Sequence, residues 1–483
     1  MTPFSTICRH LSHCLLWIAM LPCWVPCTVH GVSRESPEPP NIVLIFCDDL
    51  GYGDIGPFGA RSHSTPHLDR MAAEGLRMTQ FYSSCSVCTP SRSSLLTGCY
   101  AQRVNMHVDH QNLCVLFPGG KKGLHPDEIT LAELLKQQGY ATACIGKWHL
   151  GDQPPFLPTR QGFDLFFGLP YSNDMGARKN TSRPPLPLMR GEGVVEAPVD
   201  QTNLTERYTQ ECIRFLRDHP RQPVFIYLPH TFPHVPLYAS EGFKGQSSNG
   251  LYGDVIEELD ASVGNILQHI RESQQENQRS TLVIFTSDNG ATAGRGRSNG
   301  PLRGYKGSTW EGGMREPFIA WWPGVIPAGT QSDALSATMD LFPTLAFLAK
   351  ASVPEDRVID GRNLWSVWHE PGKHRPSPRK TFYYYQMQQL QAIRDHRWKL
   401  HLALSPKLRN WGKPVAQTSM MLFDLQQDPG EKHDVAQHHP EVVERLLAQV
   451  QAMRVELGDL GMQGQGQRPA GWVEQTRMLY IDQ

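Results

Sequence analysis

The stretch Asn41-Ile42-Val43-Leu44-Ile45-Phe46 decides the fold class of this chain of 483 residues. Prolines precede this apolar run, and Cys47-Asp48-Asp49 follows it. An apolar run between prolines and a polar turn is typical of a strand that is covered on both faces of a sheet. Thr281-Leu282-Val283-Ile284-Phe285-Thr286 repeats the pattern and also ends in polar residues. The sequence therefore predicts two buried strands of one sheet.

Helical and strand patterns alternate between and around these two runs. Helical spacing of apolar residues predicts helices over 66–74, 129–138, 208–217 and 252–272, and short apolar runs predict strands over 141–145 and 224–228. This alternation predicts a large α/β domain, residues 41–370, with a mostly parallel central sheet between helices. The segment 175–202 is rich in Pro, Gly and Arg, which predicts a long loop.

The composition changes around residues 370–378, which are rich in Pro, Gly, Lys and Arg. Beyond them, strand patterns cover 381–385, 392–403 and 421–425, and an amphipathic helical pattern covers 440–457. We therefore predict a small C-terminal α+β domain, residues 380–483, with an antiparallel sheet.

The first residues resemble a secretory signal peptide. Arg9 precedes the apolar stretch Leu15-Leu16-Trp17-Ile18-Ala19-Met20-Leu21, which is too short to span a bilayer comfortably. We predict a signal peptide over 1–32 and a linker over 33–40, without an integral membrane span. The protein would be exported to the periplasm, the extracellular space or the lysosome, depending on the host.

The charge and the cysteines narrow the classes of function. The formal net charge is −1, so nucleic acid is not an expected partner and an anion must be bound by a local pocket. Four of the 11 cysteines precede residue 33, which leaves seven in the exported part. An odd number indicates that one cysteine has a separate role.

The motif Cys88-Thr89-Pro90-Ser91-Arg92 predicts a reactive turn that leads into a helix. The positive helix N-terminus and the guanidinium of Arg92 would favour a bound anion. Cys85 and Cys88 also form a C-x-x-C pair, for which a disulfide, half of a zinc site or a redox pair are the alternatives. The chain contains no second C-x-x-C, which argues against a four-thiolate zinc site.

Two predicted strands end in oxygen-bearing side chains, Asp48 and Asp49 after the first and Asp288 and Asn289 after the second. Ligands of open α/β sheets bind beyond the carboxyl ends of strands, so these side chains can meet in one crevice. Oxygen ligands suit calcium or magnesium. Taken separately, Asp-Asp can cap a helix and Asp-Asn-Gly is a common turn.

Several basic side chains are further candidates. Lys147 and His149 lie two residues apart after a predicted strand and can point the same way. His230 and His234 have the spacing of a helical zinc site, but the prolines at 229, 233 and 236 exclude a regular helix, so we reject zinc. Lys306 lies in Tyr305-Lys306-Gly307-Ser308-Thr309-Trp310-Glu311-Gly312-Gly313. Each of these residues is more often simply solvated or structural when it occurs alone.

Taken together, Cys-x-Pro-x-Arg, the hexapeptide Gly146-Lys147-Trp148-His149-Leu150-Gly151 and the Lys306 motif resemble the sulfatase family. The resemblance implies an alkaline-phosphatase-like fold for the large domain. It also implies that a formylglycine-generating enzyme oxidises Cys88 to formylglycine, whose aldehyde hydrate is the nucleophile. Asp48, Asp49, Asp288, Asn289 and the modified Cys88 would then surround one divalent ion, usually Ca²⁺, with Mg²⁺ as the alternative.

The same resemblance implies roles for the other residues. Lys147, His234 and Lys306 would contact the sulfate, with His230 as the fallback for His234, and the segment Pro170-Tyr171-Ser172-Asn173-Asp174 adds Ser172. Asp288 would help to deprotonate the hydrate, and His234 or Lys306 would protonate the leaving alcohol. His149 would then accept a proton as sulfate is released.

The chain looks most similar to the branch that contains arylsulfatase A and N-acetylgalactosamine-6-sulfatase. We therefore expect a sulfuric ester hydrolase that acts on sulfated sugars or polysaccharides, such as N-acetylgalactosamine 6-sulfate or galactose 6-sulfate, or on aryl sulfates. The alternatives are a phosphate or phosphonate ester hydrolase of the same superfamily and a non-catalytic disulfide or binding protein.

Overall fold

The computed structural model describes residues 39–177, 183–275, 279–371, 376–404, 409–410, 413–414, 417 and 419–480. The predicted signal peptide lies outside the described residues, as do residues 33–38 of the predicted linker. Residues 36–483 form one compact unit. No helix within the described ranges has both the length and the apolar character that a bilayer crossing requires.

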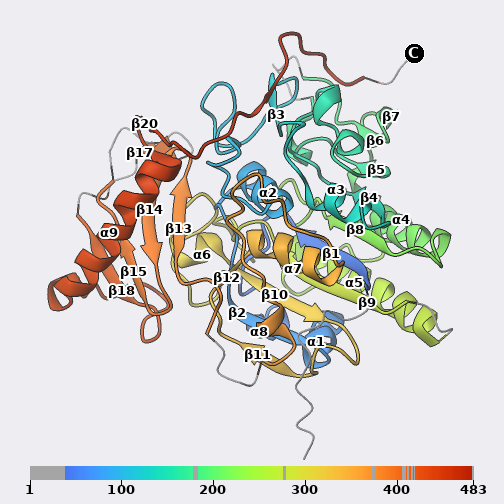
Figure 1. The fold of residues 1–483 in the computed structure, drawn as a ribbon. Helices are drawn as coiled ribbons and strands as arrows, with labels where there is room; N and C mark the ends of the chain where they lie inside the picture. The colour runs from blue at the N-terminus through green and yellow to red at the C-terminus, as the bar shows by residue number, and fades with distance from the viewer. Residues whose placement is uncertain are drawn as a thin grey trace, which may run out of the picture. The chain divides into compact units, whose positions relative to one another are not determined.

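Strand β1 (Asn41–Cys47) lies in the interior of a large sheet, between β8 (Val224–Pro229) and β9 (Thr281–Ser287) and parallel to both. Strands β4 (Ala141–Ile145) and β5 (Leu165–Gly168) continue the parallel part beyond β8. The strand order is β11 (Thr330–Ser332), β2 (Leu76–Tyr82), β10 (Arg315–Trp321), β9, β1, β8, β4, β5, β6 (Leu188–Arg190) and β7 (Gly193–Glu196) (Figure 1). The predicted mostly parallel sheet is confirmed.

Antiparallel strands border this parallel part on both sides. Strand β10 (Arg315–Trp321) runs antiparallel to β9 and to β2 (Leu76–Tyr82). The short strands β11 (Thr330–Ser332) and β12 (Ser336–Ala337) add to β2.

Six of the helices in the described chain pack in two groups. In one group α5 (Gly250–Gln275) contacts α4 (Leu204–Asp218) and α1 (Pro66–Ala73). In the other, α2 (Cys88–Thr97), α3 (Leu131–Lys136) and α7 (Leu341–Leu348) contact one another. Strand β4 touches α3 of one group and α4 of the other, as expected for a sheet that is covered on both faces.

The predicted loop 175–202 differs from the structure in one respect. It contains a hairpin of β6 (Leu188–Arg190) and β7 (Gly193–Glu196), which extends the sheet antiparallel to β5. Gly191 makes the turn with a φ of 61°, a conformation that glycine adopts readily. The hairpin strands are short and lie at the sheet edge, so they carry little of the apolar pattern that predicts a strand.

The C-terminal sheet consists of β13 (Phe382–Gln386), β14 (Gln389–Arg394), β15 (Trp398–His401) and β18 (Met421–Asp424), all antiparallel, as predicted. The run 392–403 is divided between two strands because the Asp395 carboxylate accepts hydrogen bonds from the backbone N–H groups of Arg397 and Trp398, at 2.9 and 2.7 Å, and makes a turn. Helix α9 (Pro440–Leu457) packs on this sheet (Figure 1).

The remaining elements are short. They are β3 (Lys122–Gly123), α6 (Glu311–Met314), α8 (Trp365–Trp368), β16 (Arg409–Asn410), β17 (Lys413–Pro414), β19 (Gly458–Asp459), β20 (Met462–Gln463) and β21 (Gly471–Trp472).

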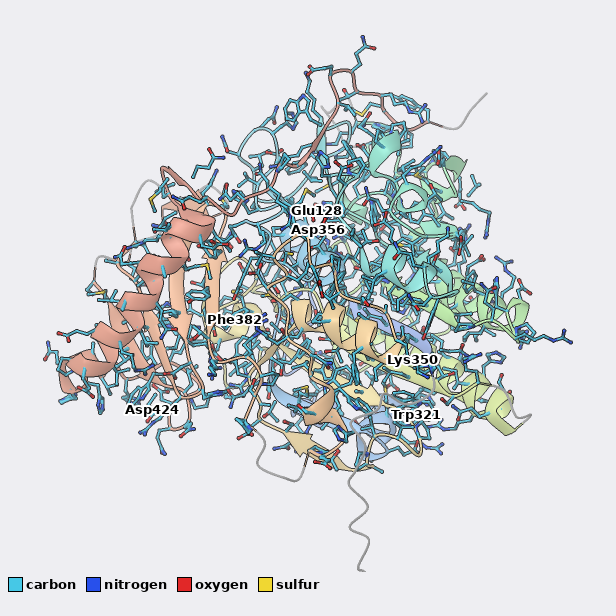
Figure 2. The ribbon with its side chains drawn as sticks, viewed as in Figure 1. Glu128, Trp321, Lys350, Asp356, Phe382 and Asp424 are labelled. Atoms are coloured by element: carbon cyan, nitrogen blue, oxygen red, sulfur yellow. The ribbon has the colours of Figure 1, made fainter. Side chains whose placement is uncertain are left out.

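One apolar cluster joins the C-terminal sheet to the rest of the chain. Tyr82 on β2 and Tyr100 after α2 pack with Phe382 and Tyr384 of β13, and all four side chains are buried. Phe382 lies where β13 faces the large sheet (Figure 2). The predicted division between residues 370 and 380 stays a prediction, and the two parts share a core.

Candidate active site

The carboxyl ends of β1 and β9 bring two of the predicted polar clusters together. The strands are paired up to Cys47 and Ser287, so Asp48 and Asp288 leave the sheet side by side. The backbone N–H of Asp49 donates to Asp288 Oδ1 at 3.1 Å. The position of these carboxylates thus follows from the parallel pairing of two buried strands.

Cys88 is the first residue of α2, which is buried along its whole length. Pro90 lies in the first turn, where its missing N–H costs no helical hydrogen bond. Cys88 Sγ lies 3.4 Å from Asp48 Oδ1 and 3.3 Å from Lys306 Nζ. Burial, with a further contribution from Asp48, raises the pKa of the Cys88 thiol well above its ordinary value. The unmodified side chain is therefore a protonated thiol and a weak nucleophile.

Cys85 and Cys88 are not joined by a disulfide in the structure. Cys85 Sγ points to the backbone oxygen of Tyr385, at 3.8 Å, and Cys88 points to Asp48. All seven described cysteines are free thiols, namely Cys47, Cys85, Cys88, Cys99, Cys114, Cys144 and Cys212.

Arg92, one turn further along α2, contacts both carboxylate clusters, and its Nη2 lies 3.6 Å from Asp48 Oδ1. Its Nε and Nη2 donate to Asp288 Oδ2 at 3.1 and 2.8 Å, and its Nη1 donates to the backbone oxygen of Lys147 at 2.9 Å. The guanidinium is fully buried, with its Cζ 5.6 Å from the centre of the Phe46 ring. Burial and the neighbouring Asp48 raise the pKa of Asp288 to about 7, although Arg92 opposes this shift.

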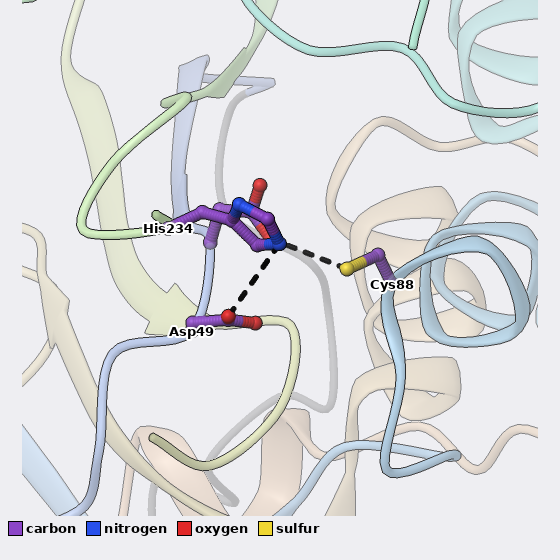
Figure 3. Close-up of side chains that lie close together, drawn as sticks. Asp49, Cys88 and His234 are labelled. Atoms are coloured by element: carbon purple, nitrogen blue, oxygen red, sulfur yellow. Dashed lines mark hydrogen bonds and ion pairs between the residues drawn. The ribbon is translucent and has the colours of Figure 1, made fainter. Parts of the chain in front are cut away.

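The side chains fit a divalent cation. Ligand atoms of Asp48, Asp49, Cys88 and His234 lie within 4.8 Å of one another, and Figure 3 shows the last three converging on one point. Asp49 Oδ2 and Asn289 Oδ1 are buried without a hydrogen-bond partner among the described residues. Orphaned buried oxygens carry a free-energy cost that a hard cation would remove. His234 joins this cluster although the sequence did not place it among the ligands.

Two lysines add positive charge to the cluster. Lys147 Nζ lies 2.5 Å from Asp48 Oδ2 and 3.3 Å from Ser172 Oγ, and Lys306 Nζ lies 2.6 Å from Asp49 Oδ1. Burial disfavours the charged form of Asp48, but the surrounding cations, Lys147 first, outweigh it and hold the pKa of this carboxyl well below its usual value. The predicted sulfate-contacting residues therefore reach the same point as the predicted metal ligands.

The hydrogen bonds of His149 define its tautomer. Nε2 lies 2.9 Å from the backbone oxygen of Leu116, which can only accept, so Nε2 carries the proton. Burial, and then the charge of Lys147, hold the pKa of His149 well below its ordinary value, so the ring is neutral. Nδ1 is buried without a hydrogen-bond partner in the described part of the chain. It therefore offers a lone pair that can accept a proton.

The two candidate histidines have different surroundings. His234 Nδ1 lies 3.0 Å from Asn173 Oδ1 and 2.6 Å from the backbone oxygen of Val235, and its Nε2 lies 3.7 Å from Asp49 Oδ2. His230 is buried against Tyr208, and burial lowers its pKa to about 3. The structure thus directs His234 to the cluster and leaves His230, the fallback, in the core. No helix joins the two, as the prolines predicted.

Sequence reasoning missed two supporting residues. Asn173 orients His234, and Thr89 Oγ1 donates to the backbone oxygen of His149 at 3.1 Å. Both lie inside motifs of the predicted site, but their partners are about 60 residues away in the sequence, so only the fold reveals the contacts.

A cavity of about 290 Å³ opens onto this cluster. Cys88, His149, Ser172, His234 and Lys306 line its polar part. Val115, Phe117, Met175 and Val235 supply its apolar lining, and Asp49, Asp174 and Thr292 complete the lining. The cavity can hold a small anionic group against Cys88 and offers apolar side chains to the face of a ring.

Comparison with known families agrees with this geometry. Residues 40–351 match the sulfatase family model, and residues 377–473 match the model of the C-terminal region of aryl-sulfatase. The chain belongs to the sulfatase family. It is 38% identical to arylsulfatase A of Bos taurus over 469 residues, which cover 89% of this chain and 90% of the relative. It is 42% identical to N-acetylgalactosamine-6-sulfatase of Canis lupus familiaris, with 76% and 73% covered.

Solved structures give the same result. The PsFucS1 sulfatase from Pseudoalteromonas sp. superposes with a TM-score of 0.77 at 27% identity, covering 86% of this chain and 90% of that one. The fold is thus that of the sulfatases, which is alkaline-phosphatase-like as predicted. The family match and the sulfatase relatives show that the chain is a sulfuric ester hydrolase.

Proposed function

We propose that this sulfatase cleaves sulfate esters of sugars or aryl alcohols with a formylglycine derived from Cys88 and one divalent cation, Ca²⁺ or Mg²⁺. One observation carries the proposal: the Cys88 side chain lies at the N-terminus of α2, on a cavity that Lys306 and His149 also line. Asp48, Asp49, Asp288 and Asn289 would hold the cation beside it.

Formylglycine at position 88 would supply the nucleophile, as an aldehyde hydrate, and the cation would supply a Lewis acid for the sulfate oxygens. The residues of the chain do the rest. Sulfate-ester oxygens repel nucleophiles, so the ammonium groups of Lys147 and Lys306 neutralise them and stabilise charge that develops in the transition state. His234 and Lys306 both line the cavity, and one or the other would donate a proton to the leaving oxygen. His149 Nδ1 can accept the proton that must leave when the site is regenerated.

The cavity suggests the size of the substrate. Its volume of about 290 Å³ lies at the small end of the range for small-molecule sites, so it suits the single ring that bears the sulfate. The apolar lining residues Val115, Phe117, Met175 and Val235 can pack against a sugar or aryl ring. Relatives named N-acetylgalactosamine-6-sulfatase and arylsulfatase A support the same two classes. Export through residues 1–32 and maturation by a formylglycine-generating enzyme belong to this proposal.

A phosphonate monoester hydrolase from Silicibacter pomeroyi shares the fold, with a TM-score of 0.60 at 18% identity. The site would accept a phosphate or phosphonate ester as another tetrahedral anion, so these esters are the second candidate substrates. Parallel assays of sulfate, phosphate and phosphonate esters of one alcohol distinguish them. We expect the sulfate ester to react fastest.

The decisive experiment is the mass of the proteolytic peptide that contains Cys88, from protein co-expressed with a formylglycine-generating enzyme. We expect an aldehyde in place of the thiol, and aryl sulfate hydrolysis that falls by at least about 1000-fold in Cys88→Ala. Cys212→Ala, which removes another buried free thiol on α4, is the matched control and should keep its activity. An unmodified, fully active thiol form would contradict the proposal.

A further inference from the structure

The loop of residues 305–311, here called the lysine loop, presents Lys306 to the site. Two backbone hydrogen bonds fix its first half, from Lys306 N to the Ala291 oxygen at 3.0 Å and from Gly307 N to the Ser86 oxygen at 2.8 Å. These bonds place the Lys306 backbone, but the second half of the loop extends away from the central sheet toward the C-terminal sheet.

Lys399 of β15 holds that second half. Its Nζ donates to the Thr309 backbone oxygen at 2.8 Å and to Glu311 Oε1 at 2.9 Å. The side chains of Lys399 and Glu311 are fully buried. A buried ammonium is costly unless its donors are satisfied, and here two of the donors are satisfied by the lysine loop.

Glu431 also contacts the second half of the lysine loop. Its Oε2 accepts from the backbone N–H of Glu311 at 2.7 Å, and its Oε1 lies 3.0 Å from Lys399 Nζ and 2.7 Å from His401 Nε2. The Trp310 ring packs on the His401 ring, with centres 4.1 Å apart. Each residue from Thr309 to Glu311 therefore has a partner that comes from beyond residue 376.

The C-terminal sheet also touches the segment that precedes Cys88. The Ser86 hydroxyl donates to the side-chain oxygen of Gln386, and Cys85 Sγ points to the Tyr385 oxygen. Both the Cys88 segment and the lysine loop are thus supported from one surface, which fixes them relative to each other.

We propose that Lys399 is a positioning residue of this enzyme, which fixes the lysine loop so that the Lys306 ammonium meets the side chain of residue 88. The inference rests on the proposed function for its effect on turnover. Packing alone does not explain Lys399, since an uncharged side chain of similar length would fill the space without the desolvation cost. Its charge holds the loop instead.

The test uses the full chain with Lys399→Met. The matched control is Arg379→Met, which removes another buried cation of the C-terminal part, one that pairs with Asp340. Folding is checked by thermal unfolding. The first readout is the rate at which acetic anhydride acetylates Lys306, which peptide mass spectrometry measures. We expect about tenfold faster acetylation in Lys399→Met and no change in Arg379→Met.

The second readout is aryl sulfate hydrolysis by the formylglycine form. We expect kcat to fall about 100-fold in Lys399→Met, as for a catalytic group misplaced by about 1 Å. In a Lys306→Ala background, Lys399→Met should add little further loss, because it acts through Lys306. Should Lys399→Met fail to fold, Gln391→Leu is the second variant. It removes the 3.0 Å bond from Thr309 Oγ1, together with the 3.3 Å bond from Gln391 Nε2 to Gln389 Oε1, and should shift both readouts in the same direction.

The outcomes separate the two claims. Unchanged Lys306 acetylation in the folded variant, or a full additional loss of activity in the Lys306→Ala background, overturns the positioning role. Faster acetylation in a chain whose parent shows no sulfate ester hydrolysis supports the positioning role and overturns the proposed function.

Discussion

Asp49 combines an unusual backbone conformation with an unpartnered carboxylate oxygen. It is a non-glycine residue with a φ of 67°, and its Oδ2 is buried without a hydrogen-bond partner in the described chain. Such backbone strain and an orphaned carboxylate oxygen both cost free energy in the absence of a ligand. A cation that coordinates this oxygen would therefore stabilise the fold as well as serve the chemistry.

Removal of the metal should lower the thermal unfolding temperature. A ligand at 100 times its Kd stabilises the native state by about 2.7 kcal/mol. We expect a chelator to lower the melting temperature of the parent chain by a few degrees and Ca²⁺ to restore it. Asp49→Asn should lose most of this response. Asp152→Asn changes another buried carboxylate, which accepts from Gly119 N at 2.6 Å, and should keep it. A parent chain that is indifferent to chelator and Ca²⁺ would refute the metal prediction.

The sequence predicts single site residues well where a strand end determines their place. Asp48 and Asp288 follow paired strands, so their proximity follows from the sheet alone. The contact of Asn173 with His234 spans 61 residues and joins two irregular segments, which no local pattern encodes. His234 beside Asp49 is predictable only as part of a family motif.

At the scale of elements, buried strands and long helices follow from the sequence. Strand β4 and helix α9 have the predicted bounds, because their apolar patterns are uninterrupted. The sequence did not predict the hairpin β6–β7, because it depends on pairing at the sheet edge. It did not predict the turn at Asp395 either, because that turn depends on hydrogen bonds to one side chain. Short elements depend on their neighbours more than on their own residues.

The helix–sheet junction at α6 gives a prediction for acid stability. Glu311, the first residue of α6, is fully buried. Burial opposes its charge, but Lys399, Arg394 and Arg315 outweigh burial and lower its pKa to about 2, from 4.5. A carboxyl with a lowered folded-state pKa stabilises the fold above the unfolded value of 4.5, and this contribution is lost as the pH falls toward 2.

Glu311→Gln removes that titration. We expect the difference in unfolding free energy between the parent chain and Glu311→Gln to be constant above about pH 5. It should shrink by about 3 kcal/mol as the pH falls to about 2. Urea unfolding at several pH values measures it. Glu74→Gln, at a half-exposed surface ion pair, is the control. The difference in unfolding free energy between the parent chain and Glu74→Gln should depend little on pH. A difference that does not depend on pH would refute the lowered pKa.

At the scale of the whole molecule, the regions that match the two family models, residues 40–351 and 377–473, share one buried cluster. Tyr82, Tyr100 and Met314 belong to the region that carries the strands of the large sheet, yet they pack in one buried cluster with Phe382 and Tyr384. Arg394 of the C-terminal sheet donates to the Tyr82 hydroxyl and to Gln80 Oε1. The C-terminal sheet is thus both a wall of the core and the support of the lysine loop.

We therefore expect the parent chain to unfold in one cooperative transition, with coincident midpoints for tryptophan fluorescence and far-ultraviolet circular dichroism. A chain that ends at residue 376 would expose Tyr82, Tyr100 and Met314 and should be insoluble or should lack a cooperative transition. Removal of residues 474–483 is the control, since it spares the C-terminal sheet and α9. Two separate transitions, or a stable chain ending at residue 376, would show that the large domain folds alone and that the shared cluster contributes little to its stability.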